Sequence, residues 1–189
     1  MKTKTRIAAV LAACAVGSAA LAQDKAQPPV MDTKVARGKY LVSTSACMDC
    51  HTPFKMGPNG PEPDMTRMLS GHPESLKMPP APKLPEGPWL IVSSGTNTAW
   101  SGPWGVSFTA NLTPDAETGL GKWNERDFIA TIRTGRHLGR GREILPPMPI
   151  PVYQNFTDED LSAIFAYLRT IPAVKNRVPE PIAPKAAAK

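Results

Sequence analysis

Five residues near the start of the chain, Cys47 to His51, have the types and spacing of a haem-attachment motif. The Cys-x-x-Cys-His pattern places two thiols three residues apart, which suits thioether bonds to the two vinyl groups of one porphyrin. The histidine that follows supplies an imidazole as the proximal ligand of the iron. The motif therefore predicts one c-type haem, held covalently by Cys47 and Cys50 and ligated by His51.

Three other roles for the two thiols remain open from the motif alone. A redox-active dithiol is expected beside a βαβ unit, whereas proline, glycine and turn residues follow His51. A disulfide between Cys47 and Cys50 would leave the histidine without a role. A zinc site needs four ligands, and outside the motif the chain offers only Cys14, His72 and His137.

The ligand on the other side of the iron decides which chemistry a haem performs. A haem with an open sixth position binds gases or peroxide, whereas two strong ligands favour electron transfer. Met148 is the predicted second ligand, because four prolines in the segment 145–151 fix the backbone around its thioether. The alternatives are His72, His137 or an open site.

Three helices are expected to position these ligands. The first, over residues 32–46, leads into the motif, and its Gly38 indicates close approach of another helix. The second is predicted over 125–134, with Gly135 as its left-handed stop. The third begins after Thr157 and carries apolar residues at helical spacing, namely Leu161, Ile164, Phe165 and Leu168.

A long proline- and glycine-rich insertion follows the motif, over residues 53–110. Ten prolines and four glycines in residues 53–88 exclude a helix of any length there. We expect an ordered loop around one edge of the porphyrin, with a short hairpin between strands 89–92 and 106–109. The second ring nitrogen of His51 is expected to donate to a backbone carbonyl of this loop, that of Pro58, Pro61 or Pro63.

Four arginines gather at the end of the second predicted helix. Cations at a helix C-terminus interact favourably with the helix dipole, which explains them without a functional role. They are equally suited to binding haem propionates or an acidic partner. The four residues are Arg133, Arg136, Arg140 and Arg142.

The N-terminal residues of the sequence predict export. Residues 1–22 have the charged start, short apolar run and Ala-x-Ala site of a signal peptide, which indicates the periplasm, with a lipid anchor at Cys14 as the minor alternative. Removing them lowers the formal net charge from +6 to +3, which leaves little support for binding to nucleic acid or for stable membrane insertion. A disordered tail is predicted over 179–189.

The chain resembles the class I c-type cytochromes, and more closely the bacterial periplasmic cytochromes that accompany dehydrogenases and oxidases. The resemblance is carried by the motif and by the segments 37–42, 111–123, 147–149 and 157–169. It implies an all-α class I cytochrome c fold over 23–178, with three main helices around one haem, and the first and last helices crossing at Gly38 against Ile164 and Tyr167.

The same resemblance implies a function. Cys47, Cys50, His51 and Met148 take the family's haem roles, with His51 and Met148 as the iron ligands. The expected protein is a one-electron carrier rather than an enzyme, whose partners are a dehydrogenase, an oxidase or another cytochrome. The competing hypothesis is a catalytic or gas-binding haem protein of peroxidase type with an open sixth position.

Overall fold

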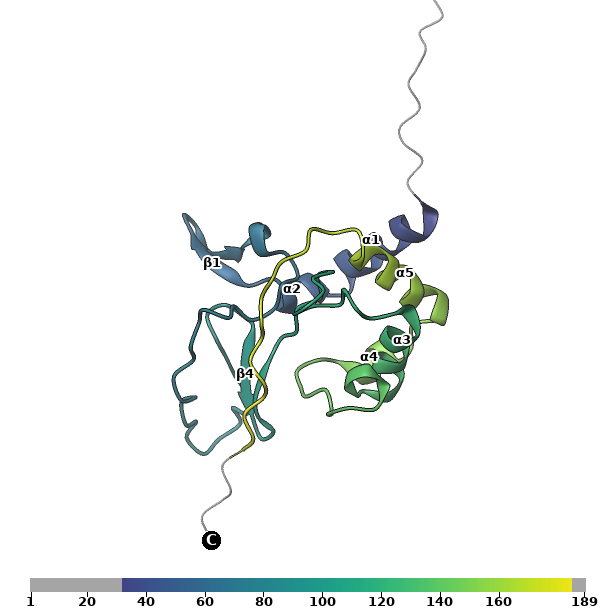
Figure 1. Ribbon diagram of the computed structural model, residues 1–189. Helices are drawn as coiled ribbons and strands as arrows, with labels where there is room; N and C mark the ends of the chain where they lie inside the picture. Colours follow the sequence, from purple (N-terminus) through teal and green to yellow (C-terminus); the bar gives the residue numbers. More distant parts are fainter. Residues whose placement is uncertain (1–31, 185–189) are drawn as a thin grey trace, which may run out of the picture. The chain divides into compact units, whose positions relative to one another are not determined.

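The computed structural model of the chain describes residues 32–184 (Figure 1). Its α-helices are α1 (Thr33–Thr44), α2 (Cys47–His51), α3 (Glu125–Thr134), α4 (Ile150–Tyr153) and α5 (Asp158–Leu168). Its strands are β1 (Phe54–Gly57), β2 (Gly60–Pro63), β3 (Val92–Ser93), β4 (Ala99–Gly102) and β5 (Gly105–Phe108). Short 3-10 turns, η1 (Met65–Arg67) and η2 (His137–Gly139), complete the elements. Within this range no helix has the length and apolar character needed to cross a membrane.

The expected all-α fold class is wrong, because the insertion between α2 and α3 contains two antiparallel sheets. One is the hairpin of β1 and β2, and the other has the order β3-β4-β5. The predicted strand over 89–92 lies mostly outside the second sheet, because β3 begins only at Val92. Trp89, Leu90 and Ile91 before it are exposed. The partner of β5 is instead β4, across a tight turn in which Gly105 has a φ of +94°. Short apolar runs do not by themselves identify the strand that pairs.

The helices agree with their local sequence signals. Helix α3 begins after Asn124, whose side chain accepts a hydrogen bond from the Asp127 amide in a capping box, and Gly135 ends the helix with a φ of +65°. Thr157 caps α5 by accepting a hydrogen bond from the Asp160 amide. These signals are contained in the first and last turns, so they could be recognised without knowledge of the tertiary structure.

Helices α1 and α5 cross in direct backbone contact at Gly38. A Cβ atom added there would lie 1.9 Å from the carbonyl oxygen of Ala163 and 2.8 Å from the Cβ of Tyr167. The close approach inferred from Gly38 is therefore confirmed, with Ala163 rather than Ile164 as the nearest neighbour. The crossing fixes the direction in which α1 enters α2, which carries the haem motif.

The chain after α5 runs back across the described part of the molecule as an extended segment (Figure 1, yellow). We call residues 174–182 the C-terminal strap. At its end, Ile182 pairs with Val106 of β5 through two backbone hydrogen bonds of 2.8 and 2.9 Å. Within the tail predicted from residue 179, Ile182 is therefore paired, and 185–189 lie outside the described range. The predicted signal peptide and Cys14 also lie outside it.

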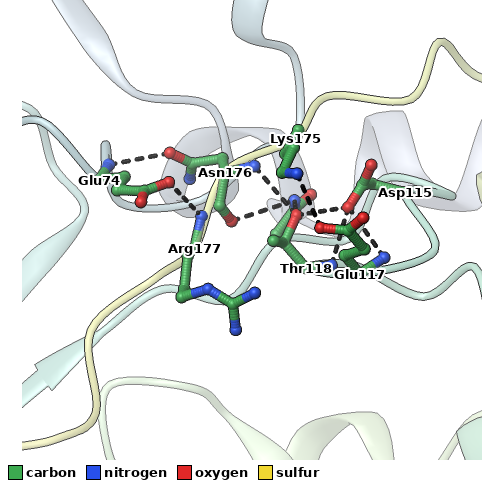
Figure 2. A network of polar contacts seen from close by, with 8 residues as sticks. Glu74, Asp115, Glu117, Thr118, Lys175, Asn176 and Arg177 are labelled. Carbon is green, nitrogen blue, oxygen red and sulfur yellow. Dashed lines mark hydrogen bonds and ion pairs between the residues drawn. The ribbon is translucent and has the colours of Figure 1, made fainter.

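Asn176 fastens the strap to the insertion (Figure 2). Its side-chain oxygen accepts hydrogen bonds from Arg67 Nη2 and from the Glu74 amide, at 2.9 and 2.8 Å. Its side-chain nitrogen donates to the backbone carbonyls of Ser70 and His72, at 2.7 and 2.8 Å. All four hydrogen-bonding positions of this buried amide are therefore satisfied, which holds the strap in one register.

Candidate functional site

A cavity of about 590 Å³ lies among the helices, β5, the loop before α4 and the strap. Its walls are mainly apolar side chains, including Val42 of α1, Ile132 of α3 and Leu161 of α5. The four residues predicted to hold a haem all line it, namely Cys47, Cys50, His51 and Met148. Side chains separated by about one hundred residues in the sequence are thus brought to one site.

Helix α2 presents both thiols to the cavity. Ala46, in the left-handed conformation with a φ of +58°, turns the chain from α1 into α2. Cys47 and Cys50 are three residues apart on one helical turn and therefore share a face. No disulfide joins them. Burial raises the pKa of Cys47 to about 11 and raises that of Cys50, which is opposite to the lowered pKa of a redox-active dithiol.

His51 has the orientation and protonation of a metal ligand. Its Nδ1 lies 2.8 Å from the carbonyl oxygen of Ala110 and donates to it, which leaves the lone pair on Nε2. Burial lowers its pKa and so favours the neutral imidazole that binds metals. No hydrogen bond to Nε2 is formed by the residues that the structure describes.

The carbonyl that orients His51 is not one of those predicted. Pro58, Pro61 and Pro63 lie in or beside the β1–β2 hairpin, which pairs with itself. The chain returns to α2 only after β5, where Ala110 passes His51 and the Thr109 carbonyl accepts from the His72 amide at 3.0 Å. A backbone carbonyl was correctly predicted as the acceptor for His51, but the residue that supplies it was predicted wrongly. Which carbonyl reaches His51 depends on the path of the whole insertion.

Met148 lies in the loop between η2 and α4 and is partly buried against the core. Two contacts hold this loop. The Ser107 hydroxyl of β5 donates to the Pro146 carbonyl at 2.6 Å, and the Ile150 amide donates to the Met148 carbonyl at 2.9 Å. The thioether is therefore carried by a backbone that is fixed on both sides.

The two other histidines differ in their access to the cavity. His72 is buried outside the lining, with Nδ1 2.9 Å from Thr98 Oγ1 and Nε2 3.1 Å from the Leu76 carbonyl oxygen. Both of its ring nitrogens are thus occupied. His137 does line the cavity, where it packs edge-on against Trp123 with ring centroids 5.1 Å apart. Its pKa is lowered by burial and by Arg142.

The polar groups of the cavity fit a porphyrin with carboxylate substituents. The indole nitrogen of Trp100 is buried and has no hydrogen-bond partner among the described residues. Arg142 and Arg177 also line the cavity, whose walls are mainly apolar.

Of the four clustered arginines, only Arg142 lines the cavity. Arg133 forms an ion pair with Asp158 at 2.6 Å and donates to two backbone carbonyls, so its role is structural. Arg136 and Arg140 donate to carbonyls of their own loop. Arg177 was not singled out from the sequence, because its segment carries no helical or strand periodicity.

The cytochrome c family model matches residues 35–172 of the chain. The chain is 30% identical to the gluconate 2-dehydrogenase cytochrome c subunit of Pantoea cypripedii over 149 residues, which cover 79% of this chain and 25% of that protein. It is 27% identical to the alcohol dehydrogenase (quinone) cytochrome c subunit of Gluconobacter oxydans over 185 residues, which cover 95% of this chain and 30% of that protein. The chain thus spans less than a third of the length of these relatives.

Proposed function

The chain belongs to the cytochrome c family, and from this premise we propose that it is a one-electron carrier with a single haem c ligated by His51 and Met148. Family membership makes it an electron-transfer haem protein, and we propose that it is not itself catalytic. The observation that carries the finer proposal is the convergence of Cys47, Cys50, His51 and Met148 on one cavity.

Each residue has a defined task in this proposal. Cys47 and Cys50 would hold the porphyrin as thioethers, and His51 Nε2 and the Met148 thioether would ligate the iron, which when bound supplies one-electron chemistry between its ferric and ferrous states. The Ala110 carbonyl fixes the orientation of the imidazole. The prolines beside Met148 hold the thioether in place in both oxidation states.

The residues that line the cavity tune the equilibrium between the ferric and ferrous states of the iron. A thioether ligand favours the ferrous form, and apolar walls penalise the extra positive charge of the ferric form. Phe128, Ile132 and Leu168 supply such walls. The arrangement thus favours a raised reduction potential in a carrier that keeps both ligands.

The relatives support a proposal for the partner, and residues 1–22 support one for the compartment. Their printed names describe cytochrome subunits of dehydrogenases, so we propose that this chain accepts electrons from a dehydrogenase and passes them to another redox protein. We propose the periplasm as its compartment because of the export signal predicted in residues 1–22. Residues 1–22 would act as the export signal, and 23–178 as the cytochrome c domain.

An equilibrium redox titration of the purified, exported protein tests this function. We expect one covalent haem per chain by mass, a single one-electron transition, and no binding of added peroxide to the ferric protein. A ferric protein that binds peroxide rapidly and turns it over would support the catalytic alternative instead.

A further inference from the structure

The C-terminal strap forms one wall of the cavity, although it lies beyond the residues matched by the family model. Residues 177–181 are part of the lining, whereas the match ends at residue 172. The strap is held on both sides of this stretch, by the Asn176 amide and by the pairing of Ile182 with Val106. Its inward-facing residues are therefore fixed parts of the site.

Among the charged residues that line the cavity, Arg177 differs in its lack of an ion pair within the described residues. Four carboxylate or guanidinium groups line the cavity, namely Glu117, Arg142, Arg177 and Glu180. Three of them form ion pairs: Glu117 with Lys175 at 2.7 Å, and Glu180 with Arg142 at 3.2 Å. Across residues 32–184, the Arg177 side chain has neither an ion pair nor a hydrogen bond. It is the lining cation left without a counter-ion.

The two cationic side chains of the strap, Lys175 and Arg177, point in different directions. Lys175 is directed at Glu117, whereas the Arg177 side chain extends away from this network (Figure 2). Lys175 is the main cause of the lowered pKa of Glu117, and Arg177 adds only a minor part. The Arg177 amide is itself fixed by a hydrogen bond of 2.9 Å to Glu74 Oε2. The backbone is thus held while the guanidinium remains available.

We propose that Arg177 binds a carboxylate of the porphyrin and that the strap delivers it to the cavity. This inference rests on the proposed function, since it requires a bound haem. A guanidinium is the side chain best suited to a carboxylate, because its planar donors can form two parallel hydrogen bonds.

The electrostatic consequence can be measured. A positive charge beside the haem opposes the extra charge of the ferric state, so Arg177→Gln favours the ferric form. We expect the ferric-to-ferrous ratio at a fixed solution potential to rise about tenfold, which for a one-electron couple lowers the midpoint potential by about 59 mV. Arg177→Lys keeps the charge and should recover at least half of this shift.

The experiment compares midpoint potentials of purified holoproteins by spectroelectrochemical titration. The matched control is Arg126→Gln, which makes the same change at an exposed position of α3 that does not line the cavity. A lower potential in Arg177→Gln, with Arg126→Gln close to the wild type, supports the assignment. Equal shifts in both variants, or none in Arg177→Gln, would overturn it.

Failure of the proposed function and failure of the Arg177 assignment would give different experimental results. If the proposed function is wrong, the wild-type protein lacks covalent haem or a one-electron transition, and the assignment of Arg177 falls with it. If only the assignment is wrong, the wild type titrates normally and the potential of Arg177→Gln is unchanged. Because Arg177 is exposed and its side chain makes no contact of its own in the network, the variant is expected to fold.

Discussion

Replacing Asn176 by alanine should strongly destabilise the folded protein. The side chain makes four hydrogen bonds, and its loss leaves the buried Ser70 and His72 with unsatisfied carbonyls. Each stranded buried group costs about 1–3 kcal/mol. The hydrogen bonds that its oxygen accepts from Arg67 and from the Glu74 amide are only partly buried, so their loss adds less. The free energy of unfolding should therefore fall by roughly 3–5 kcal/mol.

The assay is denaturant unfolding of the holoprotein, followed by far-ultraviolet circular dichroism and by haem absorbance. For a protein of this size, the loss corresponds to a fall in melting temperature of roughly 10 °C. The control is Asn155→Ala, because Asn155 is exposed and bonds only to carbonyls of its own turn, those of Pro151 and Val152. It should cost less than about 1 kcal/mol. If Asn176→Ala were as stable as this control, the strap would not be held by the amide.

Two further substitutions test the helix crossing and a buried histidine. Gly38→Ala should destabilise the protein by about 2 kcal/mol, because overpacking outweighs the gain in helix propensity, whereas Gly95→Ala meets no atom within 4 Å and should be near neutral by thermal unfolding. Burial lowers the pKa of His72, so the unfolded chain takes up the proton first and stability is lost as the pH falls below 6.5. His72→Gln should make the unfolding midpoint less dependent on pH in this range, and an unchanged slope would contradict the assignment.

The parts of the site that were predicted from the sequence are those determined by local contacts. The thiols and the imidazole of α2 lie within five residues, and the ends of α3 follow from its own cap and stop residues. Gly38 could be recognised as a contact point because a glycine inside a helix is otherwise unfavourable. Its partner helix could be named only through the family resemblance.

The parts that were missed depend on contacts between distant segments. The His51 ring is oriented by a carbonyl 59 residues away, and Asn176 binds groups more than 100 residues before it. Strand β4 was overlooked because its sequence, with Ser101 and Gly102, lacks an apolar alternation, and only pairing with β5 makes it a strand. Such pairings follow from the path of the whole chain, which no local pattern specifies.

The most direct test of the central claim is the ferric optical spectrum of purified Met148→Ala, compared with the wild type and with Met56→Ala. Met56 is 77% exposed in β1 and does not line the cavity, so it serves as the matched methionine. We expect a low-spin spectrum with a methionine-to-iron charge-transfer band in the wild type and in Met56→Ala, and loss of that band in Met148→Ala. A band that persists in Met148→Ala, or a wild-type protein without it, would contradict ligation by Met148.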